Sequence, residues 1–423
     1  MSTMTIAEKI RKKKIKKPNF TYNVLGWVWK TFVAKKYNVH YTYNTDIRAE
    51  KGAYIVISNH ASRLDYIFTG IPFLPARLNF VAGYNEFFRS HLAFVFDLLC
   101  VIPKRNFTPD SYTIKEINRV LKDGGRIMLF PEGMSSISGA NQPVAVGTGQ
   151  FLKHYKLPVF YTVIKGGYLT SPKFNVTDRP GKVEVVIDKL FTPEQLETLS
   201  AEEIEDMVNK AIYHDDYAWN KTAQNRYAIG DKGAEHMEDL LFWCPKCHRQ
   251  HTMKGEGNKL YCTACGNGMT LTETYDMQPL DDTCVLPETP TAWFNLQREV
   301  IKAEVQDEGF ALTEKVKLGN LPKYKQLTDQ KTSEIVGEGT LTLDRTGLTY
   351  DGTRDGEPFA FHIDSKNLPT YGMCTDVSRF YTFYKGEFME FYPEHNTVEK
   401  FFLATEEIHR LNGGKWQDFK FEK

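Results

Sequence analysis

Asn59, His60 and Asp65 have the side chains and the spacing for acid–base chemistry. Asn59 and His60 follow an apolar run at 54–57 that predicts a buried strand, and Asp65 comes five positions after the histidine. Imidazole can take the proton of an attacking hydroxyl near neutral pH, and an aspartate on its other ring nitrogen fixes the tautomer. Such a pair can transfer an acyl group from a thioester to an alcohol without a serine or cysteine nucleophile. Alone the spacing is weak evidence, because the chain has 11 histidines.

Three further segments at predicted strand ends support this interpretation. Residues 102–105 (Ile-Pro-Lys-Arg) offer two cations where a phosphate or carboxylate could bind. Residues 130–133 (Phe-Pro-Glu-Gly) predict a tight turn that brings a carboxylate and backbone amides to the same edge of the sheet. Residues 157–159 (Leu-Pro-Val) open a further strand.

In this order the four segments resemble the four sequence blocks of the glycerolipid acyltransferase family, whose best-known members acylate lysophosphatidic acid. The resemblance covers roughly residues 45–190. It implies that His60 and Asp65 are the catalytic pair, and that acyl-CoA or acyl carrier protein is the donor. It also implies that phosphatidic acid is made from 1-acyl-glycerol 3-phosphate. The implied substrate-binding residues are Asn59, Lys104, Arg105, Glu132 and Gly133.

The third block departs from the family pattern. Family members commonly continue it with Thr and Arg, whereas this chain has Met134 and Ser135. The missing arginine removes one phosphate contact, which Lys104, Arg63 or Lys165 could replace. A second hypothesis therefore keeps acyl transfer but gives the enzyme a different lyso-lipid or an amino-acid-containing lipid as acceptor.

A cluster of four cysteines lies near the middle of the chain: Cys244, Cys247, Cys262 and Cys265. Two Cys-x-x-Cys pairs separated by 14 residues are typical of one tetrahedral zinc site, with an iron site as the alternative. His248 and His251 are predicted to be surface residues, because four thiolates complete the shell. The segment 240–272 resembles a zinc ribbon in which structural zinc replaces a core. Its modest basic charge favours a structural spacer, or a docking site for an unidentified protein partner, over nucleic acid. A third hypothesis is a non-catalytic scaffold that only recognises lipids.

The acyl-transfer motifs require a domain that brings strand ends together, predicted at 46–230. Apolar runs predict strands buried on both faces at 54–57, 79–82, 101–102, 127–130, 159–164 and 183–187. Helical patterns lie at 66–73, 86–98, 111–122 and 147–155, and a closing helical segment runs to about 219. This alternation predicts an α/β fold with a mostly parallel sheet flanked by helices.

Residues 290–423 predict a further, β-rich domain. A helix at 293–305 precedes short strands at 340–343, 348–350, 359–363, 380–384 and 387–392, and a helix at 404–411 ends the pattern. This succession loosely resembles a pleckstrin-homology or similar lipid-binding domain. A small β-rich domain with another partner is an equal alternative.

Residues 1–45 predict association with a membrane. Seven of the first seventeen residues are basic. Apolar residues then recur at helical spacing opposite lysines: Val24, Trp27, Val28, Thr31 and Phe32 against Lys30, Lys35 and Lys36. A basic amphipathic helix binds anionic lipid surfaces; the alternative is a solvated tail followed by a helix that caps the domain.

Hydropathy and net charge limit where the protein can lie and what it can bind. No apolar run reaches the roughly 18 residues of a spanning helix, and no signal-peptide pattern follows the charged start. The formal net charge of +0 gives no electrostatic argument for nucleic acid. We therefore expect a cytoplasmic protein, peripheral on the inner face of the cell membrane, with membrane lipids as partners.

Overall fold

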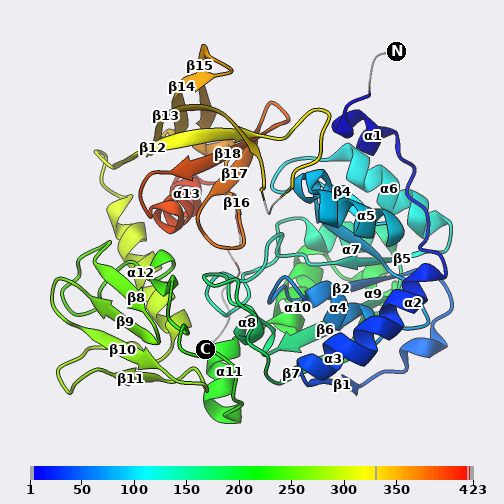
Figure 1. The fold of residues 1–423 in the computed structure, drawn as a ribbon. Helices are drawn as coiled ribbons and strands as arrows, with labels where there is room; N and C mark the ends of the chain where they lie inside the picture. Colours follow the sequence, from blue (N-terminus) through cyan, green and yellow to red (C-terminus); the bar gives the residue numbers. More distant parts are fainter. Residues whose placement is uncertain (1–3, 329–330, 417–418, 420–423) are drawn as a thin grey trace.

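The computed structural model describes residues 4–328, 331–416 and 419, which contain three sheets (Figure 1). The first has seven strands and flanking helices, the second has four strands beside the cysteine cluster, and the third has seven strands. The predicted fold class is confirmed, since an α/β sheet, a cluster of four cysteines and a β-rich C-terminal region follow one another along the chain.

Five strands of the first sheet run parallel, and two at one side run the other way. The order is β1-β7-β6-β2-β5-β3-β4, with β7 antiparallel to β6 and parallel to β1. The bounds are β1 (Val39–Tyr43), β2 (Tyr54–Ser58), β3 (Asn79–Gly83), β4 (Ile102–Lys104), β5 (Arg126–Leu129), β6 (Val159–Lys165) and β7 (Val183–Phe191). The edge strand β1 escapes prediction because its residues are half-buried or exposed and form no apolar run.

Helical elements surround this sheet. They are α1 (Ile6–Lys12), α2 (Thr21–Val28), the π-helical turn η1 (Trp29–Val33), α3 (Ala34–Lys36), η2 (Ile47–Ala49), α4 (Asp65–Gly70), η3 (Tyr84–Phe88), α5 (Ser90–Leu98), α6 (Ser111–Lys122), α7 (Thr148–Tyr155), α8 (Gly167–Thr170), α9 (Pro193–Thr198), α10 (Ala201–Ile212) and α11 (Asp216–Ala223).

The central strand β2 sends its side chains alternately into two cores, one on each face of the sheet. Tyr54 and Val56 belong to one cluster, and Ile55 and Ile57 to the other. Helices α6, α7 and α10 contribute to the second cluster, whereas α4 and α2 contribute to the first. Because the strand is buried on both faces, its sequence is a continuous apolar run. Its carboxyl end delivers residues 59 and 60 to the edge of the sheet.

The segment α2–η1–α3 is a continuous helix with two apolar faces. Tyr22 and Trp29 pack into the core, while Trp27 and Phe32 are 62% and 64% exposed beside the exposed Lys30. The apolar stripe predicted from the sequence is therefore the outward face. None of the helices in the described residues has the length and the apolar composition that crossing a bilayer requires.

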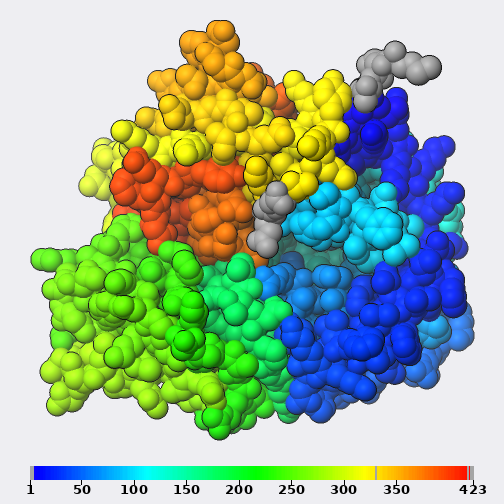
Figure 2. All heavy atoms as spheres, viewed as in Figure 1, coloured from blue at the N-terminus to red at the C-terminus, as the bar shows by residue number. Residues whose placement is uncertain are grey.

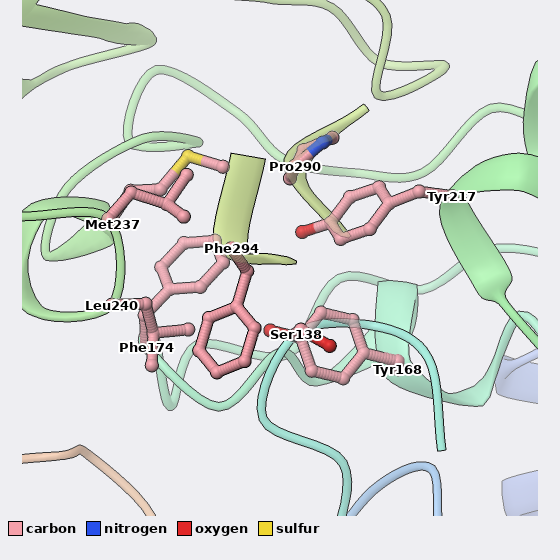
Figure 3. Close-up of a pocket in the computed structure, with 9 residues that line it drawn as sticks. Ser138, Tyr168, Phe174, Tyr217, Met237, Leu240, Pro290 and Phe294 are labelled. Carbon is pink, nitrogen blue, oxygen red and sulfur yellow. The ribbon is translucent and has the colours of Figure 1, made fainter. Parts of the chain in front are cut away.

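The region around the four cysteines packs closely against the region of the first sheet. It contains η4 (Met237–Asp239), β8 (Met253–Glu256), β9 (Lys259–Cys262), β10 (Gly268–Leu271) and β11 (Met277–Pro279), and α12 (Pro290–Glu304) follows. Figure 3 shows Tyr168 and Phe174 of the first region facing Met237, Leu240 and Phe294 around a small hollow. The cavity measures about 10 Å³, which is close to the space of one water probe, so this junction is tightly packed.

The C-terminal sheet is antiparallel, with the order β15-β14-β13-β12-β18-β17-β16. Its elements are β12 (Ala311–Asn320), β13 (Glu334–Asp344), β14 (Gly347–Arg354), β15 (Glu357–Asp364), η5 (Ser365–Asn367), β16 (Gly372–Met373), β17 (Phe380–Tyr384), β18 (Glu387–Pro393) and α13 (Val398–Leu411). The strands β12 and β16 add to the five predicted from the sequence, and α13 begins six residues earlier than its pattern suggests.

The connection between β12 and β13 joins the C-terminal region to both the N-terminus and the first sheet's helices. The backbone N–H of Ile6 donates to the carbonyl of Lys323 at 2.9 Å. Leu327 exchanges backbone hydrogen bonds with Phe88 at 2.8 Å and with Ser90 at 2.9 Å. In Figure 2 the yellow segment that contains Lys323 lies against the blue N-terminal segment. The last region is thus fastened by main-chain contacts to the first.

Candidate active site

His60 and Asp65 are in direct contact at the carboxyl end of β2. His60 Nδ1 lies 2.8 Å from Asp65 Oδ2, and Asp65 is the first residue of α4. The backbone N–H and the hydroxyl of Ser62 also donate to the Asp65 carboxylate, each at 2.9 Å. Burial raises the pKa of Asp65, and the hydrogen bonds from His60 and Ser62 oppose that rise. The contact favours a proton on Nδ1, which leaves the lone pair on Nε2 to accept another.

The rest of His60 is held from three sides. Glu132 Oε1 accepts the His60 backbone N–H at 2.6 Å, and the His60 carbonyl accepts the backbone N–H of Ser136 at 2.6 Å. The imidazole stacks on Phe130 with ring centroids 4.4 Å apart. The side chain of His60 is 25% exposed, against 1% for Asp65. The imidazole is therefore fixed in orientation while part of it faces outward.

Glu132 is a buried brace. Its second oxygen accepts the backbone N–H of Gln142 at 2.9 Å, so both carboxylate oxygens hold main chain. Burial raises the pKa of Glu132 well above its ordinary value, the two backbone N–H groups oppose this, and the charge of Asp65 adds to it. Gly133 follows with φ of +84°, a conformation that favours glycine.

The side chain of Asn59 also forms hydrogen bonds with backbone groups. Its side-chain amide donates to the carbonyl of Ile164 at 2.9 Å and accepts the N–H of the same residue at 2.7 Å. This pair of bonds ties the end of β2 to the end of β6. The sequence pattern places Asn59 and Glu132 at the correct edge of the sheet, but spacing does not reveal that backbone groups occupy their polar atoms.

The two cations after β4 differ in their surroundings. Lys104 is half-buried, and its Nζ donates to the carbonyl of Arg105 at 3.2 Å. Burial lowers the pKa of Lys104, and the charge of Asp110 opposes this. The Arg105 guanidinium lies over the ring of Tyr84 at 5.3 Å. Within the described residues neither cation forms an ion pair with a carboxylate, so both remain available to an anion.

A further cation lies beside the third block. Lys173 Nζ donates to the hydroxyl of Ser135, one of the two residues at which this block departs from the pattern expected from the sequence, at 3.1 Å. Lys173 is buried, and burial lowers its pKa. Arg63, one of the cations suggested from the sequence, is paired instead with Asp178 at 2.7 Å. No sequence signal points to Lys173, because 38 residues separate it from Ser135.

A known family model matches the part of the chain that contains this site. Residues 38–165 match the family model described as Acyltransferase, from the start of β1 to the end of β6. This part of the chain is an acyltransferase domain. The matched range contains each candidate residue from Asn59 to Gly133.

Part of the chain is also similar to a solved structure. The chain is similar to the crystal structure of the 1-acyl-sn-glycerophosphate (LPA) acyltransferase PlsC from Thermotoga maritima, with 20% sequence identity and a TM-score of 0.40. That similarity covers 51% of this chain and 83% of the other chain. No curated protein matches the sequence.

Next to the acyltransferase domain, the four cysteines gather in one cluster that could hold a metal ion. All four sulfurs lie within 4.8 Å of one another. The pairs Cys244–Cys265 and Cys247–Cys262 are each 3.7 Å apart. Zinc–sulfur bonds of about 2.3 Å in a tetrahedron would place sulfurs about 3.8 Å apart. The exposed His251 stacks on Phe242 instead of joining the cluster.

Proposed function

We propose that the acyltransferase domain moves a fatty acyl group from acyl-CoA or acyl carrier protein to the hydroxyl of 1-acyl-glycerol 3-phosphate, giving phosphatidic acid. The proposal rests on one observation, the 2.8 Å contact between His60 Nδ1 and Asp65 inside an acyltransferase-family domain. That contact leaves Nε2 free to meet a substrate hydroxyl.

In the proposed reaction His60 is the general base. Its Nε2 takes the proton of the acceptor hydroxyl as the oxygen attacks the thioester carbonyl. Asp65 stabilises the imidazolium that forms. The carbon–sulfur bond then breaks, and the leaving thiolate takes the proton from His60. The products are an ester and a free thiol, with no net proton gained or lost.

Arg105 and Lys104 are assigned to the phosphate of the acceptor. Both cations lack a carboxylate partner among the described residues, and guanidinium groups bind phosphate in a bidentate manner. Asn59, Glu132 and Gly133, implied as substrate-binding residues by the family resemblance, receive different roles. Asn59 and Glu132 hold the end of β2 and the backbone of His60, and Gly133 lets neighbouring groups approach the turn.

The N-terminal helix supports work at a membrane surface. Phe20 and Val24 are exposed together with Trp27 and Phe32, and Lys30 and Lys35 are exposed on the same segment. An outward face of aromatic residues and lysines suits the boundary between headgroups and acyl chains. We therefore place the protein on the inner face of the cell membrane, bound peripherally.

A second acceptor class is favoured by the third block. Ser135 stands where the family carries arginine, and Lys173 beside it is buried, so the phosphate environment differs from the usual one. A lyso-lipid with another headgroup, or an amino-acid-containing lipid, is the alternative acceptor. The zinc-ribbon scaffold without catalysis remains as the third candidate.

One assay separates the three candidates. The full-length protein is mixed with liposomes, a labelled acyl donor and single acceptors: lysophosphatidic acid, a larger-headgroup lysophospholipid, monoacylglycerol and an amino-acid lipid. Preferred labelling of lysophosphatidic acid, lost in His60→Ala and retained in the exposed His154→Ala, supports the proposal. Preferred labelling of another acceptor supports the second candidate, an acyltransferase with a different lipid acceptor. Absence of turnover with every acceptor refutes both enzymatic candidates.

A further inference from the structure

The segment Arg105–Phe107 lies between the candidate active site and the C-terminal region. Phe107 has φ of +59°, in the left-handed region. Its ring atom Cε1 is 3.0 Å from the point where a Cβ on Gly133 would lie. Gly133 follows Glu132, whose carboxylate holds the backbone of His60. The ring of Phe107 therefore covers the turn that positions the proposed base.

The C-terminal region holds the other side of the same segment. The indole of Trp416 meets the ring of Phe107 edge to face, with centroids 5.5 Å apart. The side-chain amide of Asn106 donates to the hydroxyl of Tyr381 at 3.2 Å. Arg105 Nη1 lies 3.4 Å from the point where a Cβ on Gly386, in the turn between β17 and β18, would stand.

Trp416 is itself firmly placed. Its indole N–H donates to Glu406 of α13 at 3.2 Å, and its carbonyl accepts from Arg410 at 3.1 Å. It is 5% exposed. A residue with a Cβ occupies the left-handed region only where its surroundings hold it there. For Phe107 those surroundings are Gly133 on one side and the anchored Trp416 on the other.

Arg105 gains a defined orientation from this arrangement. Its guanidinium is stacked over Tyr84 at 5.3 Å and bordered by Gly386, and the ring of Tyr84 meets Phe383 of β17 at 6.4 Å. No carboxylate pairs with it in the described part of the chain. A planar guanidinium that is held in place without a carboxylate partner is pre-organised for a phosphate.

We propose that the C-terminal β-rich region completes the acceptor site of the acyltransferase domain, with Trp416 and Tyr381 as positioning residues that hold Arg105–Phe107 in the phosphate-binding conformation. This inference rests on the proposed function. It assigns the C-terminal region a direct part in choosing a phosphorylated acceptor. Simple packing between two regions would instead affect stability and all substrates alike.

Kinetics with two acceptors test the inference. Trp416→Ala should raise KM for lysophosphatidic acid by about tenfold or more, and Tyr381→Phe by about threefold, whereas KM for the acyl donor and for monoacylglycerol stays within about twofold. Trp416→Phe keeps an aromatic ring against Phe107 and should recover part of the loss. The matched control Phe359→Ala removes a half-buried ring of β15 in the same sheet and should leave both acceptors unchanged. Equal losses for phosphorylated and unphosphorylated acceptors would overturn the inference.

Headgroup binding separates failure of this inference from failure of the proposed function. Calorimetric titration of glycerol 3-phosphate is carried out in the His60→Ala background, so no turnover is required. Binding that is weakened about tenfold by the added Trp416→Ala change, and unchanged by Phe359→Ala, supports the inference even if the acyl acceptor is reassigned. Equal affinity with and without Trp416, in samples with the same melting temperature, would overturn it.

Discussion

Glu132 accepts the backbone N–H of His60 at 2.6 Å, so the proposed base is held through its main chain as well as through its ring. The other oxygen of Glu132 fixes the N–H of Gln142. A carboxylate has only acceptors to offer, and both of its oxygens meet donors here. The turn after β5 and the end of β2 are thus locked to one another by one buried side chain.

Glu132→Gln should damage activity although its shape is nearly unchanged. An amide presents an NH₂ group that would face one of the two backbone N–H donors, and the His60 segment would shift. We expect kcat to fall on the order of 100-fold, measured with labelled donor at saturating acceptor. The exposed Glu197→Gln serves as the control. Full activity in Glu132→Gln would show that the brace is dispensable.

Asp65→Asn should lower kcat and leave KM nearly unchanged. The amide can no longer stabilise an imidazolium, and it can donate to Nδ1 and favour the wrong tautomer. The loss should be about 10²- to 10⁴-fold. Asp178→Asn, which removes a surface partner of Arg63 and Lys36, should retain activity. Steady-state kinetics of the two variants decide the matter, and similar kcat values would contradict the assigned pair.

The outward face of the N-terminal helix should carry membrane binding. The double change Trp27→Ser and Phe32→Ser should reduce sedimentation with phosphatidylserine liposomes at least about tenfold, because buried apolar area drives interfacial insertion. Added salt should weaken the remaining binding through screening of the lysines. Ile335→Ser alters an exposed apolar residue of β13 and should have no effect. Unaltered sedimentation of the double variant would refute this face as the anchor.

Metal analysis should find about one zinc per chain, bound by the four cysteines. Cys262→Ser should lose that zinc and expose the junction near Met237 and Phe294 to limited proteolysis, because the metal would no longer hold the two Cys-x-x-Cys turns together. Cys100→Ser, in the acyltransferase domain, should retain the metal. A folded protein without zinc or iron would remove the ribbon interpretation.

Glu399 should make the protein less stable as the pH rises. It is buried, its oxygens have no hydrogen-bond partner among the described residues, and burial raises its pKa well above the ordinary value, with Arg298 and Lys173 opposing the rise. The folded state therefore keeps its proton at pH values where the unfolded chain has lost it, so the free energy of unfolding falls through that window. Glu399→Gln should raise the free energy of unfolding by ~1–3 kcal/mol. Urea unfolding should show a larger gain at about pH 8 than at about pH 5. The exposed Glu357→Gln should leave the free energy of unfolding unchanged. A gain independent of pH would contradict this.

The sequence predicts best where local pattern and tertiary environment agree. Helix α6 begins and ends where its pattern does, because Asp110 caps it and Ile117, Val120 and Leu121 fall on one buried face. Strand β17 also has the predicted bounds, since its flanking turns are marked by polar residues. The edge strand β1 and the two-residue β16 lack such patterns and are defined by their partners in the sheet.

Residue spacing predicts which residues lie at the candidate site, but not which groups their side chains contact. It places Asn59, His60 and Glu132 at strand ends, where the structure has them. It does not tell that the Asn59 amide bonds Ile164 or that Glu132 accepts the His60 backbone N–H, because these contacts join residues more than 70 positions apart. Lys173 beside Ser135 is hidden for the same reason.

The backbone hydrogen bond between Ile6 and Lys323 has a consequence for biosynthesis. Translation releases the first helix long before residue 323 leaves the ribosome, and domains generally fold from the N-terminus onward. Ile6 therefore lacks its main-chain partner Lys323 until the β12–β13 connection has emerged from the ribosome. We therefore expect the main-chain contact that joins α1 to the C-terminal region to form late in synthesis.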